Sequence, residues 1–205
     1  MMRAIVLICL NILLFSCVPQ ELPQGEGGDF SVALKWSEVQ TSSDWDIYLR
    51  KALEEHGEDL MSSIPNDIGR FSKNYSILNY NQRLNFWAYL ISMMAKKESN
   101  WRPETFYMEN FNDNNGDNVI SRGLLQISIE SARGYDCPLN DANDLHDPEK
   151  NLICTVLILS RWVQRDKVIS KQTSSGSWLG GARYWSVLRK ESHLKYFTDD
   201  TLKLF

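Results

Sequence analysis

The sequence of 205 residues lacks the motifs by which several large classes of enzyme are recognised. Its three histidines, His56, His146 and His193, show no metal-ligand spacing. It has no Gly-x-Ser-x-Gly motif, so a serine nucleophile of that kind is not indicated. Basic residues are not in excess: the formal net charge is −4, which disfavours nucleic acid because phosphate binding needs a clustered basic face. We therefore expect no metal, no cofactor and no nucleic-acid partner.

The apolar run near the N-terminus is too short to span a membrane. It extends over twelve residues, from Ala4 to Phe15, whereas a membrane-spanning helix needs about 20. One arginine precedes it, and the whole is typical of a signal peptide. The run ends in LFSC, Leu14 to Cys17, which resembles the bacterial lipobox. Residues 1–17 are therefore predicted to be a lipoprotein signal with Cys17 as the lipidated residue, and an ordinary signal peptide with an incidental cysteine is the alternative.

The residues after Cys17 predict a flexible tether, a location in the cell envelope and a single domain. Residues 18–29, VPQELPQGEGGD, are rich in Pro, Gly and Gln, which is typical of a flexible linker. Cys17 is followed by Val18 and not by the aspartate that resembles an inner-membrane retention signal, so we expect the periplasmic face of the outer membrane. Residues 30–205 show no repeat and no second linker, and they are predicted to form one domain.

Two of the four cysteines are expected to form a disulfide. Cys9 would leave with the signal peptide, and Cys17 would carry lipid. Cys137 and Cys154 then remain in an oxidising compartment, where such a pair tends to join. Two free, buried thiols are the alternative.

Apolar periodicity predicts a mainly α-helical fold with a small irregular or short-strand lobe. Helices are expected over residues 43–62, 81–98 and 147–166, the last with Asp147 as its cap and Pro148 in its first turn. A shorter helix is expected over residues 179–192. Residues 100–134 are polar and irregular, and one or two short strands are expected there, near residues 123–128.

Glu98 is the residue that does not fit a simple core pattern. Leu84, Trp87, Ile91 and Met94 form the apolar stripe of a helix, and Glu98 occupies the next position of that stripe. Burial and the negative end of the helix dipole would both raise the pKa of this carboxyl, as a general acid requires. A solvated glutamate at a helix end is the alternative interpretation.

Four short motifs follow one another around and after Glu98. They are Glu98-Ser99, the stretch SRGLLQ at residues 121–126, the helix start DPEKN at residues 147–151, and Ala182-Arg183-Tyr184. In this order the motifs resemble those of the lytic transglycosylases of the soluble-lytic-transglycosylase (SLT) type, within the lysozyme-like superfamily. The resemblance extends over residues 84–189 and implies a lysozyme-like fold.

The resemblance also implies which residues form the site. Glu98 matches the single catalytic acid of the family, and Tyr184 matches its cleft tyrosine, although the asparagine that usually follows is absent here. The other matches imply a lining for the sugar cleft, namely Ser99, Ser121, Gly123, Leu124 and Gln126. Gly123 suits close approach of backbone to ligand, and the Gln126 amide suits sugar hydroxyls or an N-acetyl group. Trp101 and Trp185 are candidates either for sugar stacking or for the core.

The activity implied is cleavage of the bond between N-acetylmuramic acid and N-acetylglucosamine in peptidoglycan, with a 1,6-anhydromuramyl product. Two alternatives remain open. A hydrolytic muramidase would use a second carboxylate, for which Glu109, Asp113 and Asp117 are available. A catalytically silent lipoprotein would only bind the glycan strands. The spacing of Asp113, Asn115 and Asp117 also invites a calcium site, but the expected glycine and glutamate positions are not filled, which favours a solvated turn.

Overall fold

The computed structural model describes residues 31–39 and 43–205. The predicted signal peptide, the lipidation site Cys17 and the predicted tether at residues 18–29 lie outside the described residues. Among those that it describes, no helix is long and apolar enough to cross a bilayer.

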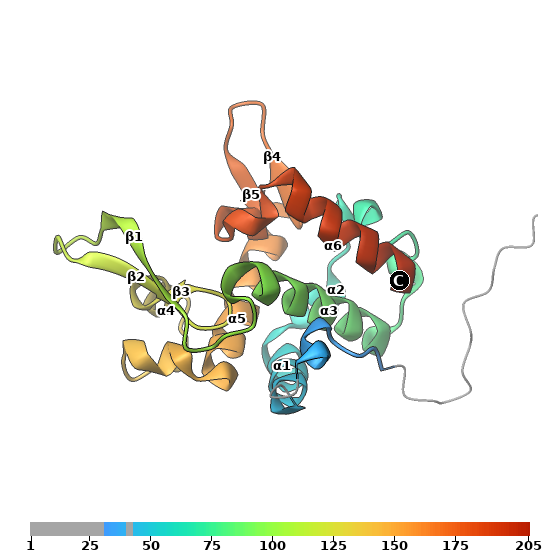
Figure 1. Cartoon of the computed structure of the whole chain (residues 1–205). Coiled ribbons are helices and arrows are strands. Elements are labelled where there is room, and N and C mark those ends of the chain that lie inside the picture. The colour runs from blue at the N-terminus through green and yellow to red at the C-terminus, as the bar shows by residue number, and fades with distance from the viewer. Residues whose placement is uncertain (1–30, 40–42) are drawn as a thin grey trace, which may run out of the picture.

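The fold is mainly helical, as the sequence predicts, with two small antiparallel sheets (Figure 1). The α-helices are α1 (Ser43–His56), α2 (Glu58–Ser62), α3 (Tyr80–Ser99), α4 (Ile129–Gly134), α5 (Pro148–Asp166) and α6 (Glu191–Leu204). The strands are β1 (Phe106–Asn112), β2 (Asn118–Arg122), β3 (Ile127–Ser128), β4 (Ser170–Gln172) and β5 (Trp178–Gly180). Short 3₁₀ turns join them, namely η1 (Lys35–Glu38), η2 (Ile68–Arg70), η3 (Tyr75–Ile77), η4 (Ala142–His146), η5 (Gly181–Arg183) and η6 (Ser186–Leu188).

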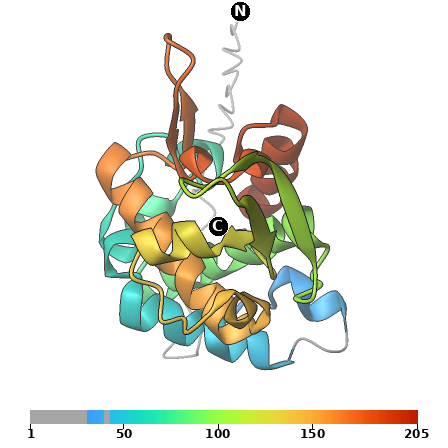
Figure 2. The same ribbon diagram turned by 90° about the vertical axis from the view of Figure 1, so that its left-hand side faces the viewer.

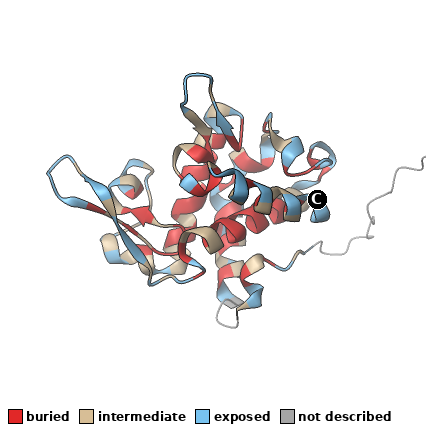
Figure 3. Ribbon diagram, turned by 45° about the horizontal axis from the view of Figure 1, so that its top comes forward, coloured by how far each residue is buried: buried red, intermediate tan, exposed pale blue. Residues whose placement is uncertain are grey.

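Helix α3 forms the centre of the core, and its predicted extent is confirmed to within one residue. It begins in a capping box, in which the Asn79 side chain accepts the Gln82 N–H and the Gln82 side chain accepts the Asn79 N–H. Trp87 is fully buried and donates its indole N–H to the Tyr75 hydroxyl at 2.7 Å. The helix ends at Asn100, whose φ of 52° closes its last turn. Figure 3 shows α3 and α5 as the most continuously buried part of the molecule.

Helix α5 also begins where the sequence predicts. The Asp147 carboxylate accepts the N–H groups of Glu149 and Lys150, and Pro148 occupies the first helical position. The predicted disulfide is confirmed: Cys137 is joined to Cys154 on α5, with the two Cα atoms 5.1 Å apart. The bond ties the segment after α4 to the buried face of α5.

Two helix predictions need correction. The run expected at residues 43–62 is broken at Gly57, whose N–H donates to the Leu53 carbonyl and ends α1. The helix expected at residues 179–192 does not form; strand β5 and the turns η5 and η6 are found instead, and α6 follows. Gly180 has a φ of 65°, and a Cβ there would lie 2.1 Å from the Val168 carbonyl oxygen, so the chain at this point is fixed by close packing on the residues just before β4 and not by helical periodicity.

The strands form two projecting hairpins. One or two short strands were expected within residues 100–134, and three form there. Strand β3, at Ile127–Ser128, lies at the expected place, and β1 and β2 were not located from the sequence. Figure 2 shows the β1–β2 hairpin facing the viewer and the β4–β5 hairpin rising at the top. The space between the β1–β2 lobe and the η5–η6 segment holds the candidate site.

Candidate active site

A cleft of about 800 Å³ lies where six parts of the chain meet. Its lining includes Glu98 at the end of α3, Glu109 and Phe111 on β1, and Ser121 on β2. The remaining walls come from Gln126, from Ser128 and α4, and from the segment that contains Arg183, Tyr184, Trp185, Ser186 and Arg189. The cleft therefore brings together residues that the sequence separates by up to 91 positions, from Glu98 to Arg189.

Glu98 lies mostly buried in this cleft, in line with the apolar stripe of α3. Its Oε1 has no hydrogen-bond partner among the described residues. Burial is the main cause that raises the pKa of Glu98 to about 7, and the nearby charge of Glu109 acts in the same direction. Lys190 and Arg189 oppose this shift without cancelling it. The carboxyl is thus protonated in about half of the molecules at pH 7, and the protonated form can act as a proton donor.

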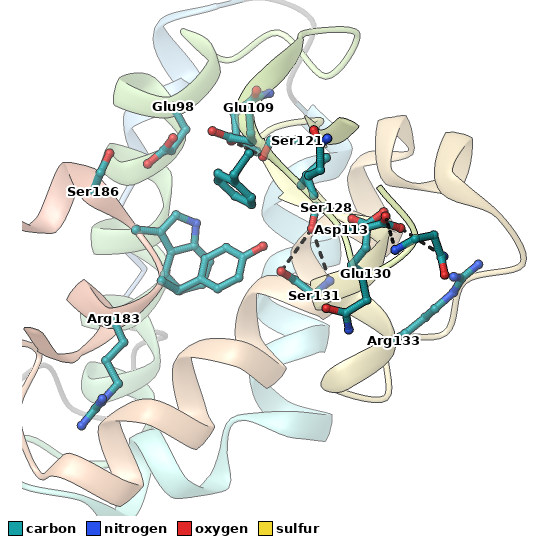
Figure 4. A pocket seen from close by; sticks show the side chains of 18 of the residues that line it. Glu98, Glu109, Asp113, Ser121, Ser128, Glu130, Ser131, Arg133, Arg183 and Ser186 are labelled. Atoms are coloured by element: carbon teal, nitrogen blue, oxygen red, sulfur yellow. Dashed lines mark hydrogen bonds between the residues drawn. The ribbon is translucent and has the colours of Figure 1, made fainter. Parts of the chain in front are cut away.

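Glu109 faces Glu98 across the cleft (Figure 4). The Ser121 hydroxyl donates to Glu109 Oε1 at 2.6 Å, which fixes the direction of this carboxylate. Glu109 lies in the irregular part of the β1–β2 ladder, between the paired residues Met108 and Asn112. The sequence offered Glu109 only as one of three carboxylates for a hydrolytic alternative, because the irregular register that turns it toward Glu98 has no local sequence signal.

Gln126 lines the cleft, but half of its amide is already engaged. Its Nε2 donates to the carbonyl oxygens of Thr105, at 3.1 Å, and Gly123, at 2.8 Å. The amide group is thereby held in one orientation, and its oxygen is the part available to a ligand donor. Gln126 itself has a φ of 48°, in the left-handed region, where a tight turn carries the chain from β2 to β3.

Gly123 is required for a different reason from the one expected. It does not line the cleft, and its φ of 78° places it against the Leu145 carbonyl and the Asn151 side chain. A Cβ would lie 2.0 Å from that carbonyl oxygen and 2.4 Å from the amide nitrogen of Asn151. The close approach is therefore between backbone and protein, and it lets Asn151 hold the turn by accepting the Leu125 N–H at 3.0 Å.

Ser99 does not lie among the residues that line the cleft. Its side chain is buried, its hydroxyl donates to the Ala95 carbonyl at 3.2 Å, and the same oxygen accepts the Arg102 N–H at 3.3 Å. The structure thus places Ser99 at the end of α3, where it satisfies backbone groups as the chain turns after Glu98. Its expected contact with sugar is replaced by this local role.

Tyr184 lies in the cleft wall, where the resemblance implies it. Burial raises its pKa to about 12, so the phenol remains a neutral hydroxyl over the physiological range. The Ser131 hydroxyl is one of its hydrogen-bonding neighbours. Tyr184 packs edge-on against Trp185, with ring centroids 4.7 Å apart.

The two tryptophans left open by the sequence both belong to the core. Trp185 is 2% exposed and donates its indole N–H to the Leu125 carbonyl at 2.9 Å, so it closes the floor of the cleft. Trp101 is also buried and donates to the Ser92 carbonyl at 2.8 Å. The aromatic side chain that reaches the cleft while remaining largely exposed is Phe111, which no sequence motif indicated.

Asp113 belongs to the turn that joins β1 and β2. Its carboxylate accepts the N–H groups of Asn115, at 2.8 Å, and Asp117, at 3.0 Å. These bonds form the solvated Asx-type turn that the sequence favours over a calcium loop.

Comparison with known proteins agrees with the mainly helical lysozyme-like fold. Residues 75–173 match the transglycosylase SLT domain. The solved structure "Bd0314 DslA wild-type form 2" is 43% identical, superposes with a TM-score of 0.79, and covers 83% of this chain and 94% of its own. Two Glu-to-Gln mutants of the same protein match at 42% identity, also with a TM-score of 0.79. No curated protein sequence matches the chain.

The fold and the cleft with its buried glutamate define a lysozyme-like protein. The chain belongs to the SLT transglycosylase family. Membership of this family supports a lytic-transglycosylase-type activity on peptidoglycan.

Proposed function

We propose that the protein cleaves the glycosidic bond between N-acetylmuramic acid and N-acetylglucosamine and leaves a 1,6-anhydromuramyl end. The observation that carries this proposal is the Glu98 carboxyl, which lies buried in the cleft with a pKa raised to about 7 and with Oε1 free of protein partners among the described residues. A carboxyl of this kind can donate its proton to a leaving sugar oxygen and then act as a base.

The proton transfers of this reaction then need no group besides this one carboxyl. Glu98 protonates the glycosidic oxygen, and the bond from that oxygen to the anomeric carbon of the muramyl residue breaks. The resulting Glu98 carboxylate removes the proton of the muramyl 6-hydroxyl, whose oxygen forms the new bond to the anomeric carbon. Glu98 is protonated again at the end, and no water is consumed.

Hydrolysis is a second candidate, and Glu109 is the observation that favours it. A lysozyme pairs a protonated carboxyl with an ionised one, which acts as nucleophile or activates water. Glu109 lines the same cleft and is oriented by Ser121. The glutamates replaced in the two DslA mutants are eleven positions apart, which is also the separation of Glu98 and Glu109.

Mass spectrometry of a digest of purified sacculi distinguishes these reactions. We expect soluble muropeptides that end in 1,6-anhydromuramic acid, which lacks one water relative to a reducing end. Reducing ends alone would show that the protein is a muramidase, and Glu109 would then be the candidate for its second carboxylate. A protein that binds sacculi but releases no muropeptide would contradict both reactions and leave only the role of a binding lipoprotein.

We also propose that a lipid on Cys17 anchors the domain to the periplasmic face of the outer membrane, so that the cleft acts on the nearby wall. The supporting observation is the LFSC motif directly after the apolar run. The Cys17→Ala variant is expected to move from the detergent phase to the aqueous phase when cell envelopes are partitioned. Equal partitioning of variant and wild type would contradict the anchor.

A further inference from the structure

A second hollow, of about 370 Å³, adjoins the cleft on the side of α4 and α5. The two share Glu130 and Ser131 in their linings, so they lie side by side. The other walls of the hollow come from Tyr135, which follows α4, and from Trp162 on α5. None of the steps proposed for Glu98 uses this hollow, yet a ligand bound in the cleft can extend into it.

The aromatic walls of the hollow are held rigidly. The Trp162 indole N–H donates to the Tyr135 hydroxyl at 2.7 Å, and the two rings meet edge to face with centroids 6.3 Å apart. Tyr135 also packs edge-on against Tyr184 of the cleft wall, again at 6.3 Å. The hollow is therefore fixed in position relative to the cleft by a continuous row of three rings.

Three arginines lie against these rings. The guanidinium of Arg161 lies 5.4 Å from the centre of the Tyr135 ring, and those of Arg165 and Arg183 lie 5.1 Å and 5.0 Å from the centre of the Trp162 ring. We call these five residues the arginine–aromatic patch. A guanidinium stacked on a ring loses mobility but keeps the N–H donors along its edge available to a ligand.

The charge of the patch is only partly balanced. Arg183 is paired with Asp166, which accepts its Nε at 2.5 Å. Arg165 reaches Asp166 only at 3.9 Å, and Arg161 has no carboxylate within salt-bridge distance among the described residues. Arg161 donates one N–H group to the Gly134 carbonyl at 3.0 Å, and Glu130 also lines the hollow. Arg161 and Arg165 are both exposed, so the other N–H donors of their guanidinium groups remain open to a ligand.

This arrangement fits a ligand with carboxylate groups, because the planar donors of arginine match a carboxylate in pairs. The muramyl residues of peptidoglycan carry peptide stems with several carboxylates, and these stems project sideways from the glycan strand. We propose that the arginine–aromatic patch binds an acidic peptide, namely the stem peptide of a strand that occupies the cleft. The identity of this peptide rests on the proposed function.

Titration calorimetry with free stem peptide tests the proposal without any turnover. The probes are the tetrapeptide L-Ala–γ-D-Glu–meso-diaminopimelate–D-Ala and the same peptide with its carboxylates amidated. In the double variant Arg161→Gln/Arg165→Gln we expect the Kd of the acidic peptide to rise about tenfold or more. A matched control, Lys73→Gln/Lys171→Gln, removes the same charge from two exposed sites outside the patch and is expected to bind as the wild type does.

A second variant keeps the test valid if the double glutamine variant does not fold. Arg161→Lys/Arg165→Lys retains both charges but loses the paired donors, so it should bind the acidic peptide more weakly than the wild type. Equal affinity for the acidic and amidated peptides would overturn the proposal. An equal loss of peptide affinity in the control Lys73→Gln/Lys171→Gln would also overturn it. So would binding of anionic lipid vesicles without binding of the peptide.

The proposal and the proposed function can fail separately. Stem-peptide binding at the patch by a protein that releases no muropeptide would contradict the proposed function alone. For an active protein, the rate on intact strands is divided by the rate on strands whose stems an amidase has removed. We expect this ratio to fall in the Arg161→Gln/Arg165→Gln variant, and an unchanged ratio would contradict stem recognition alone.

Discussion

Glu98→Gln is expected to lower turnover of peptidoglycan by roughly 10²–10⁴-fold, the usual contribution of a positioned general acid. Glutamine keeps the shape of the side chain but has no proton to donate. In the wild type, the pKa of about 7 means that Glu98 is protonated below neutral pH and loses its proton as pH rises. The wild-type rate should therefore decline as the pH passes through about 7, which a pH profile of muropeptide release measures.

Unfolding measurements separate this loss from a loss of fold. Since the pKa of Glu98 is raised in the folded state, ionisation of this group costs stability above its unfolded pKa, and the full cost is present above pH 7. Glu98→Gln removes that cost, so its free energy of unfolding should exceed that of the wild type at pH 8 and approach it near pH 4. The control Glu104→Gln makes the same chemical change at an exposed residue outside the cleft. Full activity in the Glu98→Gln variant would contradict the assignment of Glu98 as the general acid.

Glu109→Gln is expected to lower turnover about a hundredfold, the scale of one electrostatic group aimed at a transition state. The negative carboxylate of Glu109 can stabilise the positive charge that develops at the anomeric carbon. It also contributes to the raised pKa of Glu98. The decline of activity at high pH should therefore move to lower pH in this variant, because Glu98 then ionises more easily.

The products formed by Glu109→Gln define the role of this residue. Anhydro products that persist at a reduced rate would identify an electrostatic role, whereas selective loss of reducing ends would identify activation of water. The companion variant Ser121→Ala keeps the carboxylate but removes its 2.6 Å hydrogen bond, so a smaller effect in the same direction is expected. An unchanged rate together with an unchanged pH profile in Glu109→Gln would show that Glu109 takes no part in the reaction.

The features that depend on near neighbours in the chain could be predicted from the sequence. The start of α5 depends on Asp147 and Pro148, and the extent of α3 follows from the apolar stripe that ends at Glu98. Both are fixed by hydrogen bonds and side-chain periodicity within a few residues. The disulfide between Cys137 and Cys154 was predictable by elimination among few cysteines.

The residues of the site were predictable in part. The order of the motifs indicated Glu98, Ser121, Gln126 and Tyr184, and all four line the cleft. Ser99 belongs to the same motif, but its hydroxyl donates to the Ala95 carbonyl at the end of α3 and does not line the cleft. The direction of a side chain at a helix end depends on how the chain leaves the helix, which the motif does not show.

Packing between distant segments decided the rest. The irregular β1–β2 register turns Glu109 toward Glu98, and the Leu145 carbonyl and Asn151 require Gly123. The packing of Gly180 on the residues just before β4 replaces the helix expected at residues 179–192. The arginine–aromatic patch likewise joins α5 to the residues that follow α4 and to η5. A sequence encodes helical contacts at spacings of three and four residues, but contacts between segments farther apart in the chain exist only once the chain has folded. The sequence by itself thus determined the extent of α3, the start of α5, the disulfide and the position of Glu98 at the end of α3, and the tertiary structure alone decided what faces the Glu98 carboxyl.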